Sequence, residues 1–165
     1  MHPLLTTSHM MLAISLGMLL AQQGRSCFIK AIPVFVYAVI LGAWLTRAME
    51  LNLNIPLISL IVAAVLGLLV SIKWTLKTYL VIALSLVSGF LVGQESAPVL
   101  IPGMKAMTIY AFFIGATITS ALVLTAVSFV SLLFRNLGNG IVLRVLGSWV
   151  VAAAVMVQVL LYGAK

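Results

Sequence analysis

Residues 55–72 read IPLISLIVAAVLGLLVSI, a stretch that contains no charged side chain. A helix needs roughly 20 predominantly apolar residues to cross the hydrocarbon core of a bilayer. Five further apolar stretches lie on either side of it, at residues 4–21, 28–45, 76–92, 107–134 and 141–162. The sequence therefore predicts an all-α polytopic membrane protein, in which residues 1–165 form a single domain, a bundle of six transmembrane helices.

The composition of the chain excludes other classes of protein. Of its 165 residues, 64% are hydrophobic and 7% are charged, whereas soluble domains carry about 25% charged residues. Disordered chains have low hydrophobicity, so disorder is excluded too. The net charge of +7 comes from Lys and Arg residues spread thinly between apolar stretches, a pattern typical of topology-setting charges. We therefore expect contact with membrane lipid, no nucleic acid and no soluble small-molecule substrate.

The distribution of basic residues predicts the orientation. Six of the nine follow the first, third and fifth spans, namely Arg25, Lys30, Lys73, Lys77, Arg135 and Arg144. Arg47, Lys105 and Lys165 lie on the opposite side. Because Lys and Arg concentrate in cytoplasmic loops, we expect a bacterial-type inner membrane, cytoplasmic or derived, with both termini extracytoplasmic.

Small residues recur at four-residue spacing inside three spans, and Ser148 and Ala152 form the stripe of the last one. Ser85, Gly89 and Gly93 form one such stripe, and Ala63 and Gly67 form another. Small side chains on one helix face let a neighbouring helix approach closely, which favours helix association in lipid. We expect these residues to pack against other helices.

Chemically active groups are sparse. The two acidic residues, Glu50 and Glu95, both lie at span ends, whereas ion and proton pathways use ionisable groups within the membrane. Phosphate-binding loops, nucleophile elbows and Cys-x-x-Cys motifs are missing from the sequence. We therefore expect no enzyme and no catalytic residue.

Two histidines remain as candidate metal ligands. His2 and His9 are about two helical turns apart, so they share one face, in the extracytoplasmic half, if the first helix begins early. Two imidazoles could hold a metal ion, although structural zinc uses four ligands. Alternatively, His2 lies at the interface and His9 hydrogen-bonds a neighbouring helix. We expect no metal held by four protein ligands.

The segment from His2 to His9 reads HPLLTTSH. It resembles the first-helix motif His-Pro-x-x-Gly-x-Asp-His of the HupE/UreJ nickel/cobalt permease family. The resemblance covers nearly the whole chain, and the glycines Gly17, Gly42 and Gly147 match family positions, so we add them to the helix-packing residues. Further matches are Ala21, Gln22, Pro33, Phe35, Arg144 and the alanines at 152–154.

In the fourth span, residues 88–95 read SGFLVGQE. This stretch is similar to the family's His-Gly-x-Ala-His-Gly-x-Glu, with Ser88 and Val92 in place of the two histidines. Both glycines and Glu95 remain. Glu95 is either a polar station on a pathway or a solvated residue at the membrane boundary.

The other departures also remove ligands. Residues 113–117 resemble the family's Phe-x-x-Ala-Thr, but Ala121 stands where the family has a histidine. Ser8 replaces the first-helix aspartate. The resemblance implies a path of imidazoles and a carboxylate, ligands that suit nickel and cobalt. Of that set, His2 and His9 remain as metal residues, and we group Ser8, Ser88, Glu95 and Thr117 as a polar pathway.

Two functions stay open. The first is a non-catalytic accessory or structural subunit of a larger membrane complex, with metal transport lost or altered, in contact with other integral membrane subunits and with a partner's bound lipids or pigments. Its partner-facing candidates are Trp44, Trp74, Tyr79, Phe112, Trp149 and Met156. The second is a secondary nickel/cobalt permease, with a divalent metal as cargo. The sequence favours the first, because a crossing ion must exchange its water for protein ligands and two histidines supply few.

Overall fold

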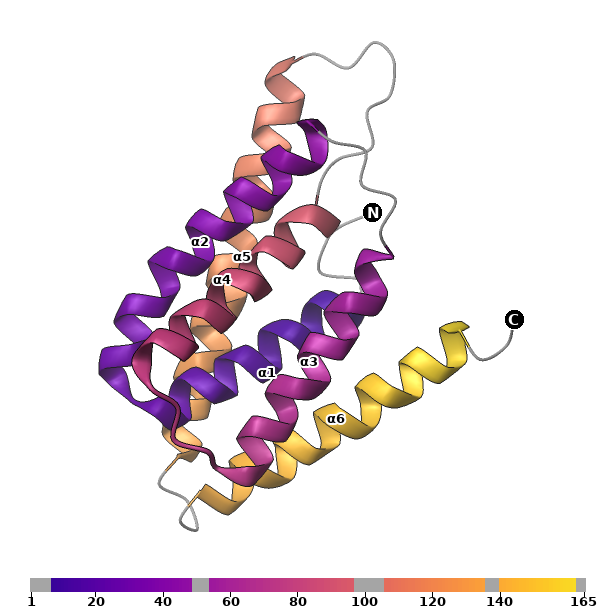
Figure 1. Ribbon diagram of the computed structural model, residues 1–165. Helices are drawn as coiled ribbons and strands as arrows, with labels where there is room; N and C mark the ends of the chain where they lie inside the picture. The colour runs from indigo at the N-terminus through magenta and orange to yellow at the C-terminus, as the bar shows by residue number, and fades with distance from the viewer. Residues whose placement is uncertain (1–6, 49–53, 97–105, 136–139, 163–165) are drawn as a thin grey trace.

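The computed structural model describes residues 7–48, 54–96, 106–135 and 140–162, which form six α-helices and no strand (Figure 1). The predicted all-α, six-helix architecture is confirmed. His2, Glu50, Lys105 and Lys165 lie outside the described residues. The helices are α1 (Thr7–Gln23), α2 (Arg25–Ala48), α3 (Ile55–Ile72), α4 (Thr78–Glu95), α5 (Ala106–Phe134) and α6 (Ile141–Tyr162).

Five of the described helices, α2 to α6, are long and apolar enough to cross a membrane. The described part of α1 has 17 residues, slightly fewer than the roughly 20 that a crossing requires. The chain is therefore a multi-pass membrane protein, and the crossing by α1 stays a prediction.

The connection between α1 and α2 is much shorter than expected. The sequence predicts a connection over residues 22–27, but a single residue, Gly24, separates the two helices. Its φ of 98° lies in the left-handed region, which glycine adopts without steric cost. Gly24 N donates to Leu20 O at 3.3 Å, and Phe28 N donates to Gly24 O at 3.2 Å. The backbone hydrogen bonds of α1 and of α2 therefore both continue as far as Gly24.

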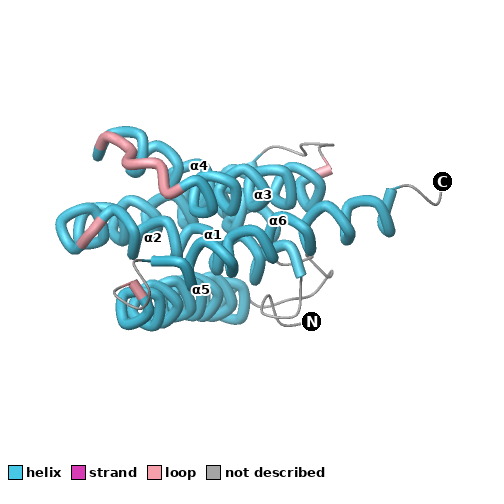
Figure 2. Tube along the Cα trace, turned by 90° about the horizontal axis from the view of Figure 1, so that it is seen from below, coloured by secondary structure: helices cyan, strands magenta, loops and turns pink. Residues whose placement is uncertain are grey.

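Successive helices alternate in direction along the bundle (Figure 1). Helix α1 lies at the centre, between α5 on one side and α3 and α4 on the other (Figure 2). Eleven of its 17 residues are buried. Around it, α2 packs mainly on α4, and α6 packs mainly on α3.

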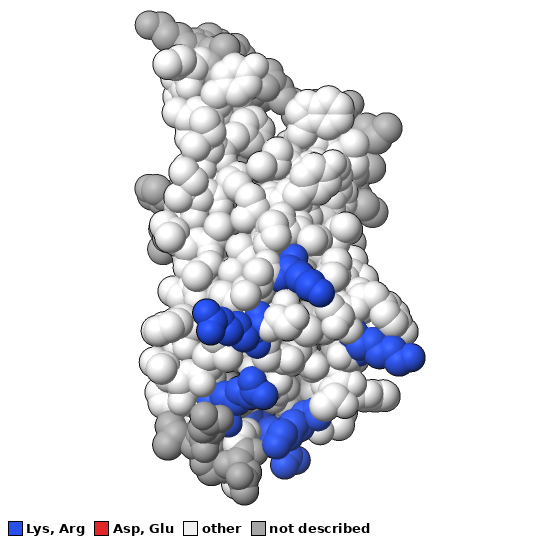
Figure 3. All heavy atoms as spheres, turned by 90° about the vertical axis from the view of Figure 1, so that its left-hand side faces the viewer, with Lys and Arg blue, Asp and Glu red and all other residues white. Residues whose placement is uncertain are grey.

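All the Lys and Arg side chains that the structure describes lie toward one end of the bundle, where α1 meets α2, α3 meets α4 and α5 meets α6. Figure 3 shows basic side chains gathered in the lower half of one face. We call this the basic end. Its cations are Arg25, Lys30, Lys73, Lys77, Arg135 and Arg144.

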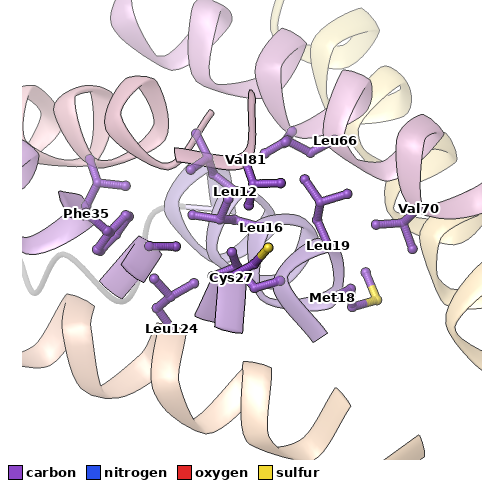
Figure 4. Close-up of a cluster of buried hydrophobic side chains, with 14 of the residues drawn as sticks. Leu12, Leu16, Met18, Leu19, Cys27, Phe35, Leu66, Val70, Val81 and Leu124 are labelled. Carbon is purple, nitrogen blue, oxygen red and sulfur yellow. The ribbon is translucent and has the colours of Figure 1, made fainter. Parts of the chain in front are cut away.

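The core is built around the apolar side chains of α1. Leu12, Leu16 and Leu19 are fully buried and recur at the spacing of one helix face. Figure 4 shows how side chains from the surrounding helices converge on them. These neighbours are Phe35 of α2, Leu66 and Val70 of α3, Val81 of α4 and Leu124 of α5.

Helices α2 and α4 approach each other at backbone distance. A Cβ on Gly89 would lie 2.5 Å from the carbonyl oxygen of Phe35, and one on Gly93 would overlap the carbonyl oxygen of Val39. From the other side, Gly42 lies equally close to the backbone of α4. Any side chain at these positions would push the two helices apart.

The remaining small residues lie at other interfaces. Gly67 of α3 and Gly147 of α6 face each other, since a Cβ on either would be 2.9 Å from the other's carbonyl oxygen. Gly17 of α1 faces a valine of α5. Ala63 and Ser85 are fully buried. Three helix pairs, α2–α4, α3–α6 and α1–α5, thus meet at glycines, which suits association in lipid.

Candidate functional site

The carboxylate of Glu95 is buried at the end of the bundle opposite the basic end. Glu95 is the last residue of α4, and its side chain is 7% exposed. Ser8 Oγ donates to Oε2 at 2.8 Å, and Ser59 Oγ donates to Oε1 at 2.6 Å. His9 Nε2 lies 2.7 Å from Oε2. These four residues, from α1, α3 and α4, are called the Glu95 site below.

The histidine and the glutamate form a charge pair when the imidazole is protonated. Their separation is within ion-pair range, but Nε2 has no partner in hydrogen-bond geometry among the described residues. We therefore treat the contact as electrostatic. A buried charge is very costly unless it is paired and hydrogen-bonded, and here the two serines and the imidazole supply those partners.

The interpretation of Glu95 as a solvated boundary residue is wrong. The sequence predicts that the fourth span ends at residue 92, but α4 continues to Glu95. Ser88, Val92 and Glu95 therefore share one helix face, since they are spaced by four and three residues. That face turns inward, and Ser88 and Val92 are buried with Glu95.

Sequence reasoning missed Ser59, which completes the Glu95 site. Ser59 lies in the first half of α3 and is 1% exposed. The sequence offers one signal for it: Ser59 carries the one hydroxyl group in the first half of a span that is otherwise apolar there. That signal does not say which helix the hydroxyl meets, because α3 and α4 are adjacent in sequence but the acceptor is at the far end of α4.

A small cavity of about 20 Å³ adjoins the imidazole of His9. A volume of this size holds about one water molecule. Its walls include Ala13, Phe35 and Val92, together with Thr119 and Ser120 of α5. Both hydroxyls donate to carbonyl oxygens of their own helix. The space beside His9 can therefore take one small species and offers few further ligands.

The other predicted residues lie apart from this network. Ser88 Oγ is fully buried and has no hydrogen-bond partner among the described residues. Thr117 Oγ1 donates to the carbonyl of Phe113 within α5, and Thr117 lines an apolar groove shared with α2. Ala121 is partly buried. Of the predicted metal and pathway residues, the structure thus brings together Ser8, His9 and Glu95.

The donor set at the Glu95 site is small. Within the described ranges, no three His, Cys, Asp or Glu side chains lie close enough to share a metal ion. His9 offers a nitrogen, Glu95 offers carboxylate oxygens, and the two serines offer neutral oxygens. Imidazole suits nickel, and carboxylate suits harder divalent cations. A divalent cation held here would keep water for part of its coordination.

Comparison with protein-family models matches residues 1–157 to the family described as HupE / UreJ protein. The match includes every residue of the Glu95 site and continues well into α6. No curated protein and no solved structure matches the chain.

Proposed function

Because the chain belongs to the HupE/UreJ family, we propose that it is a secondary permease for a divalent cation of the nickel/cobalt type, with the Glu95 site as a polar station on the path. The observation that carries this proposal is the buried pair of His9 and Glu95. Ionisable side chains inside membrane bundles are costly and mark substrate and ion pathways. Family membership likewise favours transport over catalysis.

The sequence alone favours an accessory subunit over a permease, whereas the buried pair of His9 and Glu95 favours the permease. A purely structural subunit gains little from such a pair, because well-packed apolar side chains are often at least as stabilising as a buried ion pair. A cation path, in contrast, needs groups that replace the water of the ion. The imidazole and the carboxylate can do this, while the hydroxyls of Ser8 and Ser59 hold the carboxylate in place.

The charge distribution supports an orientation in which the basic end faces the cytoplasm and the Glu95 site faces the other side. A Thr75→Cys variant in a Cys27→Ala background places a label in the α3–α4 connection, at an exposed position. We expect an impermeant maleimide to modify it only in inverted vesicles. Modification in intact, right-side-out cells would reverse the orientation.

Transport is tested with the purified protein in liposomes that enclose a nickel- or cobalt-sensitive dye. We expect flux by the natural protein and a loss of about tenfold or more in His9→Gln and Glu95→Gln, as for groups that bind or orient a metal. Ser59→Ala should slow the flux. Ser85→Ala is the matched control, because Ser85 is a buried serine that donates within α4. Folded natural protein that carries no metal would contradict the proposal.

An accessory subunit is the second candidate, favoured by the wide apolar surface of α5 and α6. Only 17% of the most apolar window of each helix is buried, and Trp149 and Met156 are 71% and 65% exposed. Lipid or the helices of other membrane subunits can cover such a surface. A stoichiometric partner that co-purifies in mild detergent, together with absent flux, would support this role. A free monomer or homo-oligomer would rule it out.

A further inference from the structure

The basic end carries a pocket of about 370 Å³ that the Glu95 site does not use. It lies between the α1–α2 turn, the α3–α4 connection and the start of α6. Its walls include Gln22, Gln23, Lys73, Trp74, Arg135 and Leu143.

Two cations reach this pocket from different helices. Arg135 follows α5 and extends to the α1–α2 turn, where its Nη1 is 3.5 Å from the position of a Cβ on Gly24. Lys73 follows α3 in the left-handed conformation, with φ 57°, and its Nζ is 3.9 Å from the position of a Cβ on Gly140. Glu95, the one acidic side chain that the structure describes, lies at the other end. The pocket is therefore electropositive.

The two glutamines give the pocket a fixed wall and a spare acceptor. Gln23 Nε2 donates to Trp74 O at 2.8 Å, and Gln23 Oε1 accepts from Leu76 N at 3.1 Å, so both ends of this amide hold the α3–α4 connection. Gln22 Nε2 donates to Val70 O at 2.9 Å. Gln22 Oε1 is buried and has no partner among the described residues. It can accept a hydrogen bond from a ligand.

Aromatic side chains place this pocket at the membrane surface. Trp74 and Tyr79 are 59% and 62% exposed on the α3–α4 connection and the first turn of α4. Trp and Tyr are enriched at the level of the lipid head groups. Phe134 and Ile141, next to the pocket in sequence, expose apolar side chains along which acyl chains can run.

We propose that this pocket binds the head group of an anionic phospholipid that carries a free hydroxyl, such as phosphatidylglycerol. Lys73 and Arg135 hold the phosphate, and Gln22 Oε1 accepts a hydrogen bond from the head-group hydroxyl. Basic pockets between membrane helices bind anionic head groups by this charge complementarity. The proposal is independent of any cation path through the Glu95 site.

Trp74 reports on the bound lipid directly. In a Trp44→Phe, Trp149→Phe background, Trp74 is the remaining tryptophan of the chain. The full-length protein is placed in phosphatidylcholine vesicles that contain a small share of lipid with brominated acyl chains. We expect brominated phosphatidylglycerol to quench Trp74 at a several-fold lower mole fraction than brominated phosphatidylcholine.

Lys73→Gln and Arg135→Gln should each reduce this preference about fivefold, as expected for removal of one cation near an anionic lipid. Lys30→Gln is the matched control, because Lys30 is exposed near the same end and does not line the pocket; we expect its preference to be unchanged. Equal quenching by the two lipids, or an equal loss in Lys30→Gln, would overturn the proposal. Displacement of the lipid by excess inorganic phosphate would also overturn it, in favour of a free anion.

Discussion

The two ends of the bundle place their charged groups in opposite ways. At one end, three helices enclose the carboxylate of Glu95, and protein atoms meet both of its oxygens. At the other end, Lys and Arg side chains lie at the surface and line an open pocket. The difference follows from side-chain length. Lys and Arg reach water and head groups along their own apolar stems, whereas a buried glutamate depends on its neighbours.

The largest expected effect is at the buried end. His9→Leu leaves the carboxylate of Glu95 with hydroxyl partners alone, and we expect a loss of about 3 kcal/mol of unfolding free energy. The double variant His9→Leu, Glu95→Leu should recover most of this loss, because both polar groups disappear together. The measurement is unfolding of the purified protein in detergent.

Arg135→Leu is the comparison at the basic end, where the side chain is exposed, and we expect a change within about 0.5 kcal/mol. If the double variant lost as much stability as the sum of the two single variants, the pair would not be coupled and the contrast between the ends would fail.

A smaller effect is expected from Gly93→Ala, which disturbs the helix that positions Glu95. Its methyl group would overlap the carbonyl oxygen of Val39 and lie 2.9 Å from Ala43 N, so we expect a loss of about 2 kcal/mol from overpacking. Gly115→Ala is the matched control, since no described atom lies within 4 Å of its Cβ position. Because alanine is the better helix former, this control should lose nothing. Equal losses in both variants would contradict the close approach of α2 and α4.

The smallest of the three effects is expected from Ser59→Ala. This change removes one hydrogen bond to a charged group, which contributes about 1.5 kcal/mol. Ser71→Ala, also on α3, removes a bond that runs only to the carbonyl of Gly67 within the same helix, and a few tenths of a kcal/mol are expected. The same unfolding assay compares the two. A larger loss in Ser71→Ala would show that Ser59 does not support Glu95.

The number of helices could be predicted because a bilayer demands apolar segments of fixed length, and residues 55–72 meet that demand without ambiguity. The residue at which α4 ends could not be predicted. Gly93, Gln94 and Glu95 look like the start of a polar loop, but they continue α4, with Gly93 against the backbone of α2 and the side chain of Glu95 buried. The partners of Glu95 were equally hidden, since they come from two other helices at sequence separations of 36 and 87 residues.

The pocket at the basic end was hidden for a related reason. A count of Lys and Arg assigns Lys73 and Arg135 to the same side of the membrane, but it does not place them around one space. Their convergence depends on the one-residue turn at Gly24 and on the left-handed conformation of Lys73. The residue types at these positions do not predict either feature.

That turn also limits how the protein can move. With Gly24 alone between them, the end of α1 and the start of α2 cannot separate, but the glycine still allows the angle between the two helices to change. Helix α4 packs on α2 at backbone distance, so we expect α2 and α4 to stay together in any larger motion. If the chain is the permease proposed above, exposure of the Glu95 carboxylate would then displace α3, with α6 packed on it, from α4, and the hydrogen bond from Ser59 would break.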